Sequence, residues 1–162
     1  MAPTVDCHEY CTGEFDPEDI VISGIAGRFP ECDNVGELKE SLYNKKDLVV
    51  FRDDRFEKGA INVPYSSCGL IRNLDKVDAK IFRLTPYIAN LTDPGARIHM
   101  EVTCEAIADA GYDPFDMRGE RIGIFNATTG DDTHRFETNA VPMPFTFRTM
   151  NPNRTSYTLD FT

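Results

Sequence analysis

Two short runs of mainly apolar residues, far apart in the sequence, are the clearest hydrophobic segments of this chain. The first covers Ile20 to Ile25 and is followed by Gly27 and Pro30, and the second covers Arg121 to Ala127. Apolar runs of this length, rich in β-branched residues and bounded by glycine or proline, are typical of buried strands. We therefore expect folded structure to begin near Ile20 and to include both segments as strands.

Helix signals recur at four other places. Short polar residues that cap the first turn, and proline at the first helical position, mark where a helix begins, and glycine marks where it ends. Residues 47 to 77 are interrupted by glycine and proline and predict loops and short strands. The signals predict helices over Val35 to Asn44 with Asp33 or Asn34 as cap, from Thr85 and Pro86 to Leu91, from Thr92 or Asp93 to Gly111, and from an Asn151 cap with Pro152 onward.

The helix that ends at Gly111 has the most regular pattern. Met100, Cys104 and Ile107 follow one stripe, which predicts a face toward the core. Arg97 and Glu101 lie four residues apart on another face, a spacing that favours an ion pair worth about 0.2–0.5 kcal/mol. This stripe makes Cys104 a small core residue rather than a reactive thiol.

The composition indicates one globular domain and excludes several classes of partner. The chain has 162 residues, of which 41% are hydrophobic and 27% charged, and a formal net charge of -10. An acidic balance argues against nucleic acid as a partner. Residues 1–18 lack periodicity and predict a flexible leader before a domain over residues 19–162. Because no apolar run is long enough to span a membrane and no signal peptide is evident, we expect a cytoplasmic location without membrane contact.

The candidate ligand groups give no convincing cofactor or metal site. Five cysteines at irregular spacing fit reduced thiols, and Cys32 and Cys68 are expected to be ordinary surface thiols. Gly24 and Gly27 do not complete a dinucleotide motif. Two polar clusters lack the pattern of a zinc site and are expected to bind no metal: Cys7, His8 and Cys11, and Asp131, Asp132, His134 and Glu137.

Taken in order, several motifs are similar to those of a known family. They are IVISGIAGRFPECDN at Ile20 to Asn34, DDR at Asp53 to Arg55, Asp93-Pro94 with Arg97 and Glu101, EAIADAGYDP at Glu105 to Pro114, RGERIGIF at Arg118 to Phe125, and Asn153-Arg154. Together they resemble the N-terminal part of a β-ketoacyl synthase, closest to the ketosynthase that opens animal-type (insect-like) fatty acid synthases. The resemblance runs from about Asp19 to Thr162.

The resemblance implies a fold and a reaction. The fold would be the incomplete N-terminal half of a thiolase-like α-β-α-β-α domain, in the α/β class. The complete enzyme is an acyltransferase that condenses acyl and malonyl thioesters on acyl carrier protein during fatty acid biosynthesis, and it can dimerise. Its nucleophilic cysteine and both catalytic histidines would lie beyond Thr162, so this chain contains no catalytic residue and is expected to be inactive alone. Asn153 and Arg154 are the candidate site-supporting residues.

The chain also departs from the family pattern. It contains no tryptophan, has His99 where the family usually has an aliphatic residue, and has Gly95-Ala96 after Asp93-Pro94. Without neighbouring strands, Ile20 to Ile25 would expose an edge that favours oligomers or aggregates. Two alternatives stay open: a non-catalytic interaction protein that pairs with an intact synthase, and a thiol or metal protein built on Cys7 to Cys11.

Overall fold

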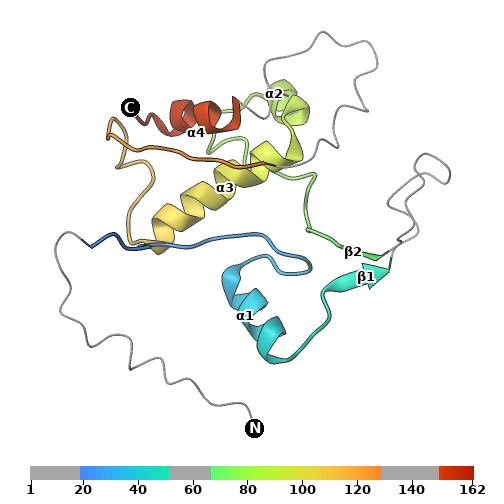
Figure 1. The fold of residues 1–162 in the computed structure, drawn as a ribbon. Coiled ribbons are helices and arrows are strands. Elements are labelled where there is room, and N and C mark those ends of the chain that lie inside the picture. Colours follow the sequence, from blue (N-terminus) through green and yellow to red (C-terminus); the bar gives the residue numbers. More distant parts are fainter. Residues whose placement is uncertain (1–18, 52–66, 129–149) are drawn as a thin grey trace.

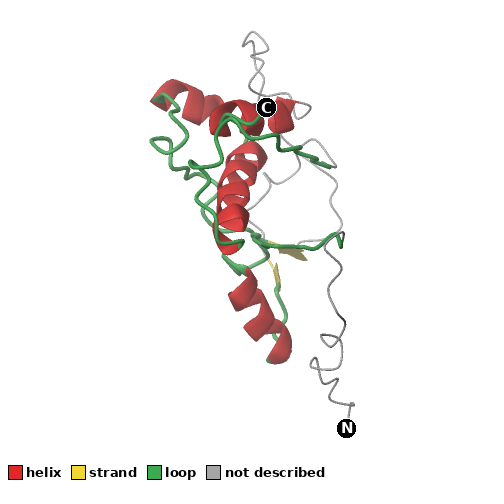
Figure 2. Cartoon of the chain, turned by 90° about the vertical axis from the view of Figure 1, so that its left-hand side faces the viewer, coloured by secondary structure: helices red, strands yellow, loops and turns green. Residues whose placement is uncertain are grey.

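A computed structural model describes residues 19–51, 67–128 and 150–162. Within these ranges the chain forms four helices and a two-stranded antiparallel sheet, joined by long extended segments and turns (Figures 1 and 2). None of the described helices combines the length and hydrophobicity needed to cross a membrane. The elements are α1 (Val35–Tyr43), β1 (Val49–Phe51), β2 (Ser67–Gly69), α2 (Pro86–Leu91), α3 (Pro94–Asp109) and α4 (Asn151–Leu159).

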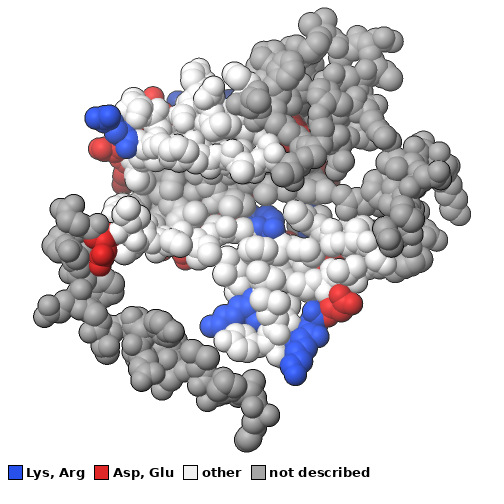
Figure 3. All heavy atoms as spheres, in the orientation of Figure 1, with Lys and Arg blue, Asp and Glu red and all other residues white. Residues whose placement is uncertain are grey.

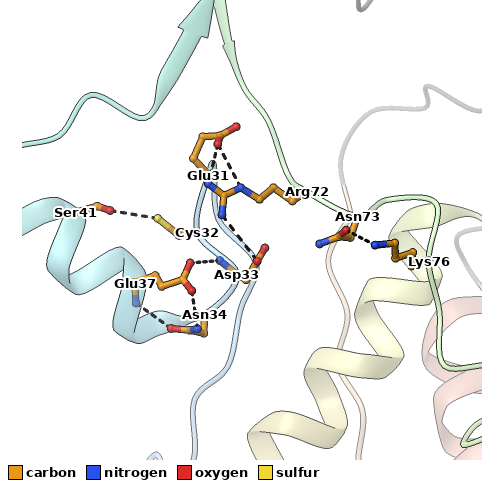
Figure 4. Close-up of polar contacts among 9 residues, drawn as sticks. All are labelled: Glu31, Cys32, Asp33, Asn34, Glu37, Ser41, Arg72, Asn73 and Lys76. Atoms are coloured by element: carbon orange, nitrogen blue, oxygen red, sulfur yellow. Dashed lines mark hydrogen bonds and ion pairs between the residues drawn. The ribbon is translucent and has the colours of Figure 1, made fainter.

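The first helix confirms the prediction and identifies Asn34 as its cap. The Asn34 side chain accepts a hydrogen bond from the Glu37 amide at 2.8 Å, and the Glu37 carboxylate accepts one from the Asp33 amide at 2.9 Å (Figure 4). This reciprocal arrangement satisfies amides that have no partner within the helix. Arg72, from the segment after β2, donates to Glu31 at 2.9 Å and holds the turn before α1 in place.

The small sheet joins this turn to the rest of the chain. Val50 pairs with Cys68 in antiparallel register, and the Glu31 amide donates to the Leu70 carbonyl at 2.9 Å. The short strands agree with the expectation for residues 47 to 77, as far as the structure describes them.

Local signals also set the bounds of α2 and α3. Thr85 caps α2 by accepting from the Ile88 amide at 3.3 Å, and Asp93 caps α3 by accepting from the Ala96 amide at 3.2 Å. Gly111 follows α3 with a φ of +87°, a conformation that glycine adopts without steric strain. Both helices are confirmed.

The core lies where α4 packs on α3, on the opposite side of the molecule from α1 (Figure 1). Met100 of α3 and Leu159 of α4 are each 1% exposed, and Phe82 and Ala96 are also buried. The prediction that Asn151 caps α4 is wrong by one residue, because the cap is Met150 and Asn151 is the first helical residue. The Asn151 side chain is buried, and its carbonyl accepts from the Thr155 hydroxyl at 3.1 Å.

The two predicted strands are not strands in the structure. Residues 20–25 and 121–127 are extended, but neither pairs with another described segment, and Ile20, Ile22 and Phe125 are almost fully exposed. An apolar extended segment becomes a buried strand only when another strand satisfies its backbone groups and a second layer covers its side chains. The described part of the chain supplies neither, so the prediction of buried strands is wrong here.

The first of these segments is instead fastened to α3. The Gly24 backbone lies against the Ala106 carbonyl and the Ala110 amide, close enough that a Cβ on Gly24 would be 2.7 Å from the Ala110 nitrogen. The Ile25 amide donates to the Asp109 carboxylate at 2.9 Å, and Arg28 donates through both terminal nitrogens to Glu105. The segment therefore follows α3 without a partner strand.

The predicted ion pair between Arg97 and Glu101 does not form. Arg97 donates to the Asp75 carbonyl at 3.4 Å, and Glu101 accepts from the Asp78 amide at 3.2 Å. Both side chains instead bond to backbone groups of the loop before α2. The prediction considered only neighbours on the same helix.

Candidate functional site

The candidate site-supporting residues Asn153 and Arg154 lie on α4 and line one pocket of about 1000 Å³ between α4, α2 and the segment before α2. Asn153 is exposed, whereas Arg154 is half-buried. Burial lowers the pKa of the Arg154 guanidinium. The other described residues that line this pocket are Phe82, Arg83, Leu84, Ile88, Arg118, Met150, Tyr157, Thr158 and Asp160.

Arg154 anchors α4 to the junction of α2 and α3. Its Nη1 donates to the Thr92 hydroxyl at 3.0 Å, and that hydroxyl donates to the Ile88 carbonyl at 2.7 Å. Thr92 is the C-cap of α2 and directly precedes the residue that caps α3, and only 1% of it is exposed. A hydrogen bond from a charged donor is worth about 1.5–3 kcal/mol, so this contact is a principal restraint on α4.

His99 provides a second restraint on the same helix. Its Nδ1 lies 3.1 Å from the hydroxyl of Thr155, which follows Arg154 in the sequence. His99 is half-buried, and this burial lowers its pKa. Two consecutive residues of α4 thus fasten it to the α2–α3 unit.

Cys104 is not an activated nucleophile. Burial, together with the nearby carboxylates of Glu105 and Glu101, raises the pKa of the Cys104 thiol to about 11. A thiol needs a lowered pKa, from a nearby cation or a helix N-terminus, to react as a thiolate at neutral pH. The raised pKa agrees with the prediction that Cys104 is not a reactive thiol, although its side chain is half-buried rather than fully within the core.

The prediction of surface thiols is wrong for Cys32, which is 2% exposed. The turn from Phe29 to Cys32 places its sulfur 3.4 Å from the Ser41 hydroxyl of α1 (Figure 4). Cys68 is half-buried on β2. Cys32 and Cys104 are free thiols.

The structure leaves two sequence clusters untested. Cys7, His8 and Cys11, and the acidic cluster from Asp131 to Glu137, lie outside the described residues. Within the described ranges, no group of three His, Cys, Asp or Glu side chains is arranged to hold a metal ion. On the face drawn in Figure 3, basic side chains are dispersed and do not form a continuous patch.

Sequence reasoning missed two arginines of the pocket, Arg83 and Arg118, and both contacts that anchor α4. Arg118 lies over the Phe115 ring at 5.0 Å, and its Nε is buried without a hydrogen-bond partner. No local sequence signal marks Arg83 and Arg118, because only the tertiary fold places them in the pocket beside α4. The role of Asn153 and Arg154 at an active site stays a prediction.

Comparisons with known proteins extend this picture. Residues 17–162 match the family model described as "Beta-ketoacyl synthase, N-terminal domain". The fatty acid synthase of Anser anser anser is 34% identical over 150 residues, which are 89% of this chain and 42% of that protein. The polyketide synthase PksL of Bacillus subtilis (strain 168) is 32% identical over 120 residues, which are 68% of this chain and 3% of that protein.

Solved structures show the same fold. A mutant ketosynthase from module 6 of the bacillaene synthase of Bacillus subtilis 168 superposes with a TM-score of 0.74 and 22% identity, covering 87% of this chain and 25% of that one. The predicted thiolase-like α/β class is thereby confirmed, and this chain is a part of that fold.

The comparisons do not single out one kind of synthase. Fatty acid and polyketide synthases have comparable identity to this chain, so the narrower expectation of an animal-type fatty acid synthase is not distinguished from a polyketide synthase. The chain spans less than half the length of these relatives. Because the family model covers nearly all of the sequence, the chain belongs to the β-ketoacyl synthase family and corresponds to its N-terminal domain.

Proposed function

We propose that this chain is the opening part of a fatty acid synthase ketosynthase, whose complete form condenses acyl and malonyl groups held on acyl carrier protein. The observation that carries the proposal is the similarity to the goose fatty acid synthase, which extends over 89% of the chain. The acyl carrier protein and the thioester substrates would be partners of the complete enzyme, in the cytoplasm.

Within that enzyme, the chain would serve as scaffold. Arg154 and Thr155 fix α4 against the α2–α3 unit, and the pocket beside α4 contains Asn153 and Arg154. In the family, the segment similar to Asn153-Arg154 lies beneath the entrance to the active site. We expect the isolated chain to have no condensing activity, because Cys104 is held as a thiol and Cys32 is buried with the Ser41 hydroxyl as its contact.

A chimeric enzyme tests the proposal. Residues 17–162 would replace the matching segment of an animal fatty acid synthase ketosynthase and, separately, of a polyketide synthase ketosynthase. Turnover of radiolabelled malonyl-carrier with a saturated acyl primer is expected from the fatty acid chimera, and only background counts from the 162-residue chain alone. A polyketide chimera that is active when the fatty acid chimera is not would contradict the fatty acid assignment.

One observation favours a second candidate, a non-catalytic protein that pairs with an intact synthase. The extended segment 20–25 exposes Ile20, Ile22 and Ile25, and its backbone has no strand partner among the described residues. Such an edge can add to a sheet in another protein. Pull-down with a full-length synthase separates the two candidates. If the chain serves only as scaffold, the synthase should capture it no more than it captures a variant in which Ile20 and Ile22 are replaced by threonine.

A further inference from the structure

The pocket beside α4 gathers positive charge in a chain that is acidic as a whole. Its described lining residues include three arginines, Arg83, Arg118 and Arg154, and one acidic residue, Asp160. The formal net charge of the whole chain is -10, so this local excess of guanidinium groups runs against the overall balance. Because a concave wall of low polarity concentrates the field of the charges that line it, the pocket should attract anions.

Arg118 is a cation without an ion-pair partner among the described residues. Its guanidinium carbon lies 5.0 Å from the centre of the Phe115 ring, and its Nε is buried without a hydrogen-bond partner. A buried donor without an acceptor leaves the guanidinium incompletely solvated, and such a group in a folded protein calls for an explanation such as a bound ion. An anion in the pocket would stabilise this charge through the part of Arg118 that lines the pocket.

The other two arginines extend the positive surface of the pocket. Arg154 is half-buried and donates through Nη1 to the neutral hydroxyl of Thr92, and burial lowers its pKa. Arg83 is exposed, and a turn fixes its backbone, because its amide donates to the Lys80 carbonyl at 3.2 Å. The pocket thus combines guanidinium groups with limited access to water and one that an incoming ligand reaches directly.

The remaining described wall of the pocket is mainly apolar. It contains Phe82, Leu84, Ile88, Met150 and Tyr157. The volume of the pocket is about 1000 Å³, which is at the upper end of the usual range for small-molecule sites. A small inorganic ion would leave the apolar wall in contact with water, whereas an anion with an apolar chain would cover it. The ligand that fits therefore has both a charged and an apolar part.

The same residues limit the charge of the ligand. Arg154 already donates to Thr92, and Asp160 would repel a ligand that carries two negative charges. Arg83 and Arg118 then remain to bind a single oxyanion. A planar guanidinium matches a carboxylate, whose two oxygens accept two parallel N–H bonds. One carboxylate is thus the head group that suits this pocket.

We propose that the pocket binds an amphiphilic monocarboxylate, a molecule with one free carboxylate and an apolar chain. The carboxylate would lie toward Arg83 and Arg118, and the chain would lie along the apolar wall. The ligand carries a free carboxylate, unlike the thioesters of the proposed function. Because the inference rests on the pocket alone, binding can fail while the chimeric ketosynthase is active, and the chimera can fail while binding is observed.

Isothermal titration calorimetry of the complete 162-residue chain at pH 7.5 tests the ligand class, with octanoate as the probe. Octanoate should bind at a single site. Octanol lacks the charge and acetate lacks the chain, so each should bind at least about tenfold more weakly, the factor expected when a charged hydrogen bond or a buried apolar chain is lost. Octyl phosphate, with its second negative charge, should also bind more weakly than octanoate.

Arginine variants locate the site. Arg83→Gln and Arg118→Gln should each weaken octanoate binding by about tenfold or more. Arg83 is exposed, so its variant tests the site even if Arg118→Gln does not fold. Arg121→Gln is the matched control, because it removes the same charge from an exposed residue outside the described lining of the pocket, and it should leave the affinity nearly unchanged. Absence of octanoate binding, equal binding of octanol, tighter binding of octyl phosphate, or an equal loss in Arg83→Gln and Arg121→Gln would each overturn the proposal.

Discussion

Replacing Leu159 with alanine is expected to lower the free energy of unfolding by about 2–5 kcal/mol, the usual cost of truncating a fully buried leucine. Leu159 of α4 is 1% exposed, as is Met100 of α3, and the two helices pack on each other. The total stability of a small domain is only about 5–15 kcal/mol, so this change removes a large part of it. Urea unfolding followed by circular dichroism would measure the loss.

The matched control for this prediction is Tyr157→Ala, two residues earlier on the same helix. Tyr157 is 89% exposed, so its truncation should change the stability by less than about 0.5 kcal/mol. If both variants lost stability equally, the core would not lie between α3 and α4 as described.

Replacing Gly24 with alanine is expected to displace the first extended segment from α3. The new Cβ would meet the carbonyl of Ala106 and would lie 2.7 Å from the Ala110 amide nitrogen, and both are helix backbone atoms that cannot rotate away. Overpacking of this kind costs about 1–3 kcal/mol. The hydrogen bond from Ile25 to Asp109 would also be lost, so amide exchange at Ile25 should accelerate.

Gly123→Ala is the matched control in the second extended segment. A Cβ there would meet only the ring of Phe125, which is 97% exposed and free to move. We expect little change in stability or in exchange at Ile25. Unchanged exchange at Ile25 in Gly24→Ala would contradict the close packing of Gly24 on α3.

The helices could be predicted because their signals are local. Asn34, Thr85 and Asp93 each bond to an amide three residues later, and Gly111 adopts its positive φ directly after α3. Such contacts join residues that are close in the sequence, so they do not depend on the tertiary fold. The one-residue error at Asn151 has a different origin, because the tertiary fold buries its side chain, which makes no cap.

The strands could not be predicted from the same kind of evidence. The composition of residues 20–25 and 121–127 shows that they are suited to a sheet, but pairing requires other segments at the correct position. The contacts that anchor α4 were missed for a similar reason. Arg154 is 62 residues from Thr92, and His99 is 56 residues from Thr155. The motifs nevertheless led to the correct family and fold class, because they recur in a fixed order along the chain.

The central claim is that the described part of this chain supplies scaffold, with Cys104 held as a neutral thiol and Cys32 buried. Intact-protein mass spectrometry after incubation with acyl-carrier thioesters at pH 7.5, in the native state and in urea, tests it most directly. The account predicts that the native chain gains no acyl group, in keeping with a Cys104 pKa of about 11 and a buried Cys32. One acyl group on a single cysteine, removable by hydroxylamine and formed only in the native state, would contradict it.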